Sequence, residues 1–261
     1  MFIPLHDSNS LKHIRRQWVT LILIAVNFAV WGLTAVAGEE SDFTTAAVLG
    51  LGFIPSVVNN IAELEPIYVL VPEDYTYLTY AFLHGNFLHV GSNMLFLWVF
   101  GDNVEDAMGH VRFFFFYCAC AAAGAFLHAF LLPASEAPLI GASGAVAGIV
   151  AAYLMLHPRV RVWVLVLGRI PLPLPAFIPL VLWIGFQYVM LIADPDGNVS
   201  WAAHAGGIAA GIVLVLFLRR RGVPLFDRTI KTPRAVVRKQ VDPVAAAQDL
   251  ADARPPQRWG R

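Results

Sequence analysis

The sequence predicts an all-α polytopic membrane protein, folded as a bundle of six transmembrane helices. Three observations carry this prediction. Hydrophobic residues make up 58% of the 261-residue chain and charged residues only 14%, a composition outside the range of soluble domains. Six separate apolar stretches each approach the roughly 20 residues that cross a bilayer. The Lys and Arg residues are confined to four segments, as expected when alternate connections lie on one side of a membrane.

The hydropathy of the chain defines six spans and one shorter apolar run. The first span is too long for an ordinary cleaved signal peptide and lacks a clean small-residue cleavage site. The shorter run, 162–167, cannot cross a bilayer and is expected at the membrane interface, before Pro171. The six predicted spans cover residues 18–37, 77–100, 113–132, 139–157, 176–193 and 199–218.

Charge segregation predicts the orientation of the bundle. All 18 Lys and Arg residues fall in the N-terminal segment, the loops 101–112 and 158–175, and the segment after residue 218. The other connections are acidic and hold residues such as Glu39 and Asp194. By the positive-inside rule, both termini are predicted to be cytoplasmic.

The chain divides into three predicted regions. Residues 1–17 form a short basic cytoplasmic segment, and residues 18–218 form the six-span domain. Residues 219–261 form a basic cytoplasmic tail that is expected to be disordered and to contact anionic lipid. Within the membrane domain, residues 38–76 form a long acidic external loop, and loops of this length are usually functional.

A serine and a histidine stand near the starts of two different spans. Ser143 lies in Gly141-Ala142-Ser143-Gly144 on the fourth span, and His204 lies in Ala203-His204-Ala205-Gly206-Gly207 on the sixth. Both spans are predicted to run inward from the external side, so the two side chains share one depth. A histidine at this place can take the serine proton during attack on a carbonyl and return it to the leaving amine.

Glycine spacing predicts that these two spans touch. Gly144 and Gly148 are four residues apart, as are Gly207 and Gly211. Small residues at this spacing let membrane helices approach backbone to backbone. Close contact between the two ridges is expected to bring the hydroxyl and the imidazole within hydrogen-bond reach.

Groups that can stabilise an anionic transition state are expected nearby. The start of the fourth helix offers free backbone N–H groups around Ser143, and we expect Gly141 and Ala142 to belong to this substrate- and oxyanion-binding segment. On the second span, His89 and Asn93 are four residues apart and share a face. None of the spans has Asp or Glu in its interior, so the sequence predicts a dyad rather than a triad.

Together these motifs resemble the rhomboid family of intramembrane serine proteases, in its bacterial six-span form. The resemblance covers roughly residues 15–220, with His and Asn on span two, Ser on span four and His on span six. It implies peptide-bond hydrolysis with Ser143 as nucleophile and His204 as general base and then acid. It also implies an oxyanion site made by the Ser143 N–H, His89 and Asn93, and a reaction without metal or cofactor.

The resemblance further implies a setting for the reaction. The partners are transmembrane protein substrates cut near the outer face, together with the lipid bilayer, and no nucleic acid; the oligomeric state is not specified. The location is a bacterial inner membrane. Glu105 resembles a structural glutamate of the family. Many members carry a Trp-Arg pair in the first external loop, but this chain has no Arg between residues 17 and 111.

Other interpretations of the same residues stay open at this point. Ser143 can serve only to ease helix contact, His128 on span three is a rival base, and His89 and Asn93 can bond each other or a neighbouring helix. A catalytically silent relative that binds membrane proteins is the main alternative function. A proton-conducting transporter would show paired halves, and a zinc protease would need His-Glu-x-x-His; neither pattern occurs in the sequence.

The lipid environment predicts a substrate type and a route to the site. A helix in hydrocarbon hides its peptide bonds, and exposing a pair of backbone groups there costs several kcal/mol. Substrates are therefore expected to carry Gly or Pro near the cut and a small residue just before it. The fifth span is bulky and aromatic with few small residues, which predicts loose contacts and a gate between spans two and five.

Overall fold

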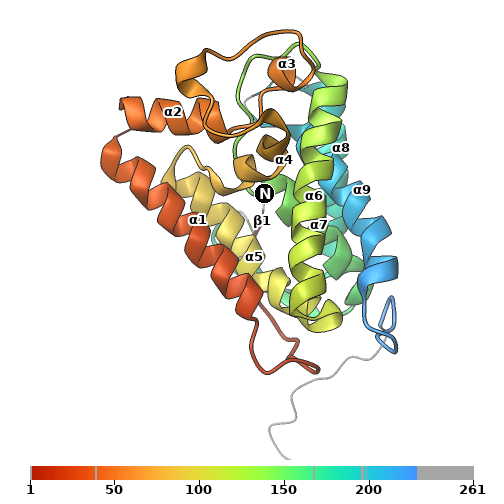
Figure 1. The fold of residues 1–261 in the computed structure, drawn as a ribbon. Coiled ribbons are helices and arrows are strands. Elements are labelled where there is room, and N and C mark those ends of the chain that lie inside the picture. The colour runs from red at the N-terminus through yellow and green to blue at the C-terminus, as the bar shows by residue number, and fades with distance from the viewer. Residues whose placement is uncertain (1, 39, 167, 195–196, 198, 228–261) are drawn as a thin grey trace, which may run out of the picture. The chain divides into compact units, whose positions relative to one another are not determined.

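The computed structural model describes residues 2–38, 40–166, 168–194, 197 and 199–227 (Figure 1). These residues belong to one compact unit, Met1–Ile230. The predicted disordered tail lies outside the described residues from position 228 onward. Its first residues do contact the helical domain, because the Arg220 N–H donates to the Ala107 carbonyl at 2.8 Å and the Phe226 N–H donates to the Met155 carbonyl at 2.6 Å.

Long helices dominate the described part of the chain, so the predicted helical membrane class is confirmed. The helices α1, α6 and α9 are long and apolar enough to cross a membrane, and α7 and α8 are shorter apolar helices. The count of six spans stays a prediction. The six longest helices of the described residues are α1 (Trp18–Ala37), α5 (Phe87–Met108), α6 (His110–Leu131), α7 (Ser143–Leu156), α8 (Phe177–Ala193) and α9 (Trp201–Leu218).

The second predicted span, 77–100, is placed wrongly, because the observed helix α5 begins at Phe87 and continues to Met108. The helical conformation is interrupted just before α5. There the Asn86 Oδ1 accepts the His89 N–H at 2.9 Å and caps the start of the new helix. Residues before the break form two short turns, α4 (Thr76–Thr79) and η3 (Tyr80–Phe82). This shift places His89 in the first turn of α5 rather than inside a span.

The far end of α5 carries two buried carboxylates that fasten the N-terminal segment. Glu105 is fully buried and accepts the backbone N–H groups of Val19 at 3.0 Å and Thr20 at 2.8 Å. Asp106 accepts the backbone N–H groups of residues 12–14. The Glu105 bonds satisfy two N–H groups in the first turn of α1, in keeping with the structural role that the resemblance implied for this residue, and the Asp106 bonds hold the segment that precedes α1.

The long loop 38–76, predicted to be external, is folded rather than extended. Its backbone pairs with the segment between α6 and α7, where Phe53 and Leu139 exchange two backbone hydrogen bonds of 3.0 and 2.8 Å. The Ser56 N–H donates to the Ser135 carbonyl at 3.0 Å. These contacts brace the loop without a Trp-Arg pair. The loop contains α2 (Asp42–Leu51), α3 (Pro55–Val58), η1 (Pro66–Tyr68) and η2 (Glu73–Tyr75).

A three-stranded antiparallel sheet, absent from the sequence-based prediction, joins distant parts of the chain. Its order is β1 (Phe2–Asp7), β2 (Arg161–Val166) and β3 (Ile170–Pro175). The short apolar run expected at the interface is the central strand of this sheet. The alternating prolines of β3 have no N–H to offer, so they leave the outer edge of the sheet without donors for a further strand.

The sheet is fastened to the bundle by one buried carboxylate. Asp7 Oδ2 accepts hydrogen bonds from the Tyr153 hydroxyl at 2.7 Å and from Asn103 Nδ2 at 2.9 Å. These two partners lie on α7 and α5. Burial raises the pKa of Asp7 from 3.8 to about 6, although the Tyr153 hydrogen bond opposes the shift.

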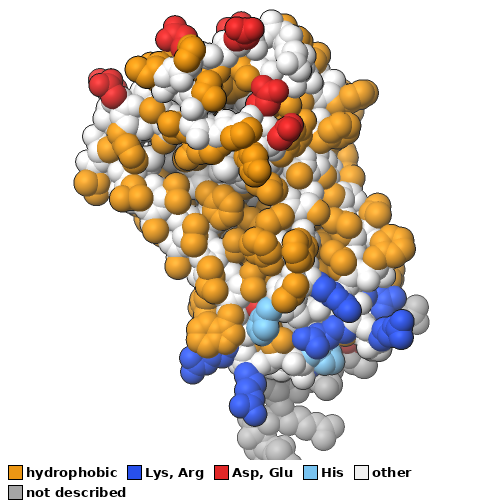
Figure 2. Space-filling view, viewed as in Figure 1, with side chains coloured by type: hydrophobic (Ala, Val, Ile, Leu, Met, Phe, Trp, Pro, Cys, Tyr) orange, Lys and Arg blue, Asp and Glu red, His pale blue; other side chains and the backbone are white. Residues whose placement is uncertain are grey.

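Charge is segregated along the folded chain. Figure 2 shows acidic side chains at the end that carries α2 and α3, basic side chains at the opposite end, and a broad hydrophobic belt between them. An apolar belt between two charged ends is the surface expected of an integral membrane protein.

Candidate active site

Glycine contacts bring α7 and α9 together. A Cβ at Gly207 would overlap the carbonyl oxygen of Gly144, and a Cβ at Gly211 would overlap that of Gly148. The two glycine ridges predicted from sequence therefore face each other. Because each ridge lies just after the serine or the histidine, the close approach of the backbones sets Ser143 and His204 at neighbouring positions.

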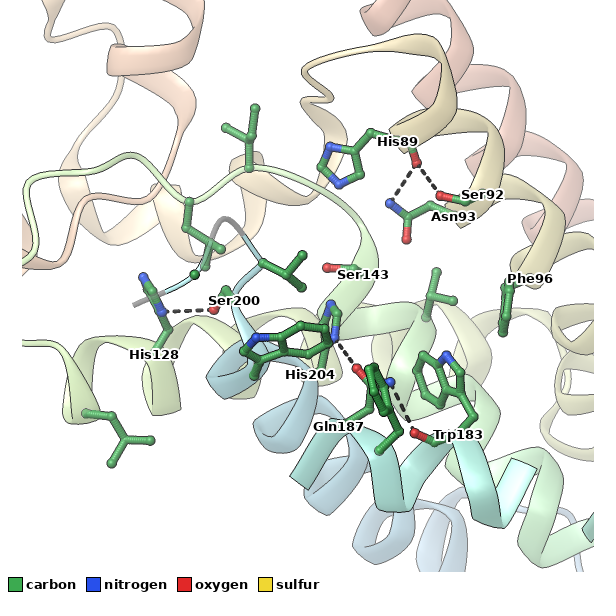
Figure 3. A pocket seen from close by; sticks show the side chains of 18 of the residues that line it. His89, Ser92, Asn93, Phe96, His128, Ser143, Trp183, Gln187, Ser200 and His204 are labelled. Atoms are coloured by element: carbon green, nitrogen blue, oxygen red, sulfur yellow. Dashed lines mark hydrogen bonds between the residues drawn. The ribbon is translucent and has the colours of Figure 1, made fainter. Parts of the chain in front are cut away.

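Both side chains line one large cavity. Its volume is about 1700 Å³, and it runs between α5 and α8 from the start of α7 toward the sheet, where Val164 and Leu174 line it. Figure 3 shows the Ser143 hydroxyl and the His204 ring directed into the same space. Among the described residues no hydrogen bond joins the two, and such bonds are often long before substrate binds.

The His204 ring is held on three sides. Its Nδ1 lies 2.7 Å from Gln187 Oε1 on α8. Trp183 stacks on the ring with centroids 6.3 Å apart, and Trp201 meets it edge to face at 5.8 Å. Only 8% of the residue is exposed, so the imidazole has little freedom to turn. The sequence predicted a dyad and named no orienting group for the imidazole, whereas the structure places the Gln187 amide against it.

The first turn of α7 presents backbone donors beside Ser143. Within the described residues, the N–H groups of Ser143, Gly144 and Ala145 have no backbone acceptor, as expected at a helix start. The two preceding amides are already occupied. The Gly141 N–H donates to the Tyr80 carbonyl at 2.9 Å, and the Ala142 N–H donates to His84 Nε2 at 3.3 Å.

Gly141 and Ala142 therefore shape the approach to Ser143 and do not offer free donors. Gly141 has a φ of +119°, a conformation that residues with a side chain rarely adopt. Its Cα faces the His89 ring, because a Cβ built on it would lie 2.6 Å from His89 Nε2. The glycine thus lets the imidazole approach the backbone in front of the serine.

His89 and Asn93 lie on the cavity wall opposite α9, as Figure 3 shows. Asn93 Nδ2 donates to the His89 carbonyl at 3.1 Å, and the Ser92 hydroxyl donates to the same carbonyl at 3.1 Å. An amide nitrogen carries two hydrogens, so one Asn93 N–H remains for a ligand. The structure brings both residues to the cavity that holds Ser143.

His128, the rival base, is engaged elsewhere on the cavity wall. Its Nδ1 lies 2.9 Å from the Ser200 hydroxyl, and Ser200 also caps α9 by accepting the Ala203 N–H at 3.1 Å. Figure 3 shows this pair apart from Ser143. A second serine–histidine pair was not predicted, and it supplies a natural comparison for the first.

The parts of an acyl-transfer site are therefore assembled inside an apolar helical bundle. A serine lies at a helix start with free N–H groups, a histidine lies on the adjoining helix, and amide and imidazole donors face them across a cavity. This combination defines a candidate serine hydrolase site within a membrane protein.

Comparison with known proteins agrees with this class. The family model Rhomboid domain matches residues 72–221, more than half of the chain. The chain belongs to the rhomboid family of intramembrane serine proteases, which act on transmembrane substrates in membranes.

Curated relatives from several eukaryotes match this region. Rhomboid protein 1, mitochondrial, from Saccharomyces cerevisiae is 30% identical over 177 residues, which is 64% of this chain and 49% of the relative. RHOMBOID-like protein 12, mitochondrial, from Arabidopsis thaliana is 28% identical over 56% of this chain and 47% of its own length. Rhomboid-related protein 3 from Homo sapiens is 29% identical over 59% of this chain and 39% of its own length. The chain thus spans about half the length or less of these three relatives.

Proposed function

We propose that the protein is an intramembrane serine endopeptidase that cuts transmembrane proteins near the outer face of the bilayer. One observation carries the proposal: Ser143 and His204 line the same cavity where α7 and α9 meet through glycine. Family membership supports the reaction class.

In the proposed reaction, Ser143 Oγ attacks the carbonyl carbon of the scissile peptide bond, and its proton passes to Nε2 of His204. The C–N bond then breaks, and the leaving amine takes that proton. Water attacks the resulting ester and gives a proton to His204. The ester C–O bond breaks, and the proton returns to Ser143 Oγ as the carboxyl fragment leaves.

The negative charge of each tetrahedral intermediate needs donors placed before the reaction starts. The free Ser143 N–H, the remaining Asn93 N–H and the His89 ring supply them in this proposal. The charge then develops beside the positive end of α7, which adds a favourable interaction.

A transmembrane substrate would reach the site from the side, between α5 and α8. Side chains of both helices line the cavity, and those of α8 include the bulky Trp183 and Phe186. Water would come from the acidic end of the molecule, which we propose to be external. The basic end seen in Figure 2 would then be cytoplasmic with both termini. A bacterial inner membrane stays a prediction, since the relatives are eukaryotic.

The decisive experiment compares two serine–histidine pairs in the purified full chain. A reporter with a Gly-containing transmembrane segment measures cleavage, and a fluorophosphonate probe measures labelling of the nucleophile. Ser143→Ala and His204→Ala are expected to lower kcat/KM by roughly 10³-fold or more and to abolish labelling. Ser200→Ala and His128→Ala serve as matched controls and are expected to keep both reporter cleavage and fluorophosphonate labelling.

Cleavage that survives Ser143→Ala but not Ser200→Ala would move the nucleophile to the second pair. A folded wild-type chain that neither labels nor cleaves would favour the catalytically silent, substrate-binding alternative.

A further inference from the structure

Gln187 is a buried amide on an apolar helix, and its burial needs an explanation. The residue is 2% exposed and stands in the middle of α8, among Leu, Ile, Trp and Phe residues. Removing an amide from water without hydrogen bonds is costly. Both of its polar atoms are in fact bonded: Nε2 donates to the Trp183 carbonyl at 3.1 Å, and Oε1 meets His204 Nδ1 at 2.7 Å.

These two contacts fix which way round the amide lies. A backbone carbonyl can only accept, so the group facing Trp183 must be the NH₂. The oxygen of Gln187 is then the atom that faces His204. An oxygen of this kind can only accept, so His204 must carry its hydrogen on Nδ1.

The tautomer of a neutral imidazole decides which nitrogen can act as a base. With the hydrogen on Nδ1, the lone pair is on Nε2. Trp183 and Trp201 hold the plane of the ring from two directions. The ring is therefore held in one orientation. Its Nδ1–H donates to Gln187 Oε1 on α8, and its Nε2 keeps the lone pair that can accept a proton.

We propose that Gln187 is the positioning residue for His204, in the place that a carboxylate takes in a Ser-His-Asp triad. This inference rests on the proposed function. A neutral amide suits this site, because a carboxylate would have to be desolvated among apolar side chains. Gln187 touches no substrate in this account and acts only through the tautomer and orientation of the imidazole.

The kinetic test replaces the acceptor and keeps the size of the side chain. Gln187→Met is expected to slow fluorophosphonate labelling of Ser143 about 10- to 100-fold, the effect of losing one well-placed buried hydrogen bond, with KM for the reporter little changed. Gln187→Glu restores an acceptor where its carboxyl is ionised and is expected to recover part of the rate there. Its pH dependence should differ from that of the wild type, since the introduced carboxyl titrates.

Asn27 offers a matched control on α1. It is also a buried amide that donates to the carbonyl four residues earlier, at 2.8 Å, and it lies outside the residues that line the cavity. Asn27→Leu is expected to label like the wild type. Wild-type labelling in Gln187→Met, or an equal loss in Asn27→Leu, would overturn the positioning role.

A second measurement needs no activity and separates this inference from the proposed function. Two-bond ¹⁵N–¹H spectra of the histidine-labelled full chain report the tautomer, with His204→Gln identifying the signal. The Nδ1–H form is expected in the wild type, and a larger share of the Nε2–H form in Gln187→Met. An Nε2–H tautomer in the wild type would refute the inference. A correct tautomer in a chain that never labels would refute the proposed function alone.

Discussion

At the level of single residues, two glycines with similar backbone conformations differ in what a side chain at their position would contact. Gly38 and Gly141 both have φ in the range that favours glycine, +96° and +119°. A Cβ at Gly38 would meet nothing within 4 Å, whereas a Cβ at Gly141 would run into the His89 ring. The first position therefore constrains only the backbone, and the second constrains the candidate site as well.

This pair gives a direct prediction. Gly38→Ala is expected to lower the free energy of unfolding by about 1–3 kcal/mol through backbone strain and to keep kcat/KM. Gly141→Ala carries a similar strain and must also push His89 away, so it should lose activity at temperatures where it stays folded. Thermal unfolding and reporter cleavage measure the two effects. Full activity in folded Gly141→Ala would show that the place of His89 does not matter for turnover.

Single residues also mark the limit of what the sequence predicts. The four-residue spacing of Gly144 with Gly148, and of Gly207 with Gly211, is local information, and it predicted the contact of α7 with α9 that the structure has. The bond between Gln187 and His204 joins two helices through one rotamer each, and no periodicity encodes it. The sequence singled out His128 as a rival base, but its bond to Ser200 was missed for the same reason, since that bond joins the start of α9 to the end of α6.

At the level of elements, the start of α5 and the sheet depart most from expectation. Residues 77 to 100 are apolar enough on average to predict one span, but His84-Gly85-Asn86 interrupts them, and Asn86 caps a new helix that begins at Phe87. The sheet pairs Phe2 with Val166, a contact so distant along the chain that short apolar runs cannot reveal it. The other five long helices lie within a few residues of the predicted spans.

The strand β1 carries a titratable link between the sheet and the bundle. Asp7 bonds to Tyr153 and Asn103, and burial raises its pKa from 3.8 to about 6. A raised acid pKa means that the folded state binds this proton more tightly than the unfolded chain does. The contribution of Asp7 to stability is then greatest below about pH 4 and is lost as the pH rises through about 6.

Asp7→Asn should remove this dependence, because an amide oxygen can still accept from Tyr153 and Asn103 and carries no charge. At pH 8 the variant is expected to unfold at a higher temperature than the wild type. This difference in unfolding temperature should become smaller toward pH 4. Thermal unfolding in detergent across this range measures the difference. A difference in unfolding temperature that does not change with pH would mean that the Asp7 carboxyl has the same pKa in the folded and the unfolded chain.

At the level of the whole molecule, one cavity runs from the candidate catalytic residues along α5 and α8. Two of its walls come from α5 and α8, whose aromatic rings Phe96 and Trp183 lie 5.7 Å apart between centroids. The same helix α8 supplies Gln187 to His204. A movement of α8 that admitted a substrate helix would therefore also release the imidazole, and its return would align the base again.

Bridging the two walls tests this coupling. In Phe96→Cys/Trp183→Cys, a reducible bis-methanethiosulfonate bridge should hold α8 closed and stop cleavage of the transmembrane reporter, and a reductant should restore it. Labelling by the small fluorophosphonate should be the same with and without the bridge, because closed α8 keeps Gln187 against His204. Each single-cysteine variant controls for the native Cys118 and Cys120 and for loss of the Trp183 ring. Unchanged reporter cleavage in the bridged protein would exclude substrate entry between α5 and α8. Loss of labelling in the bridged protein would mean that the bridge disturbs the candidate catalytic residues directly.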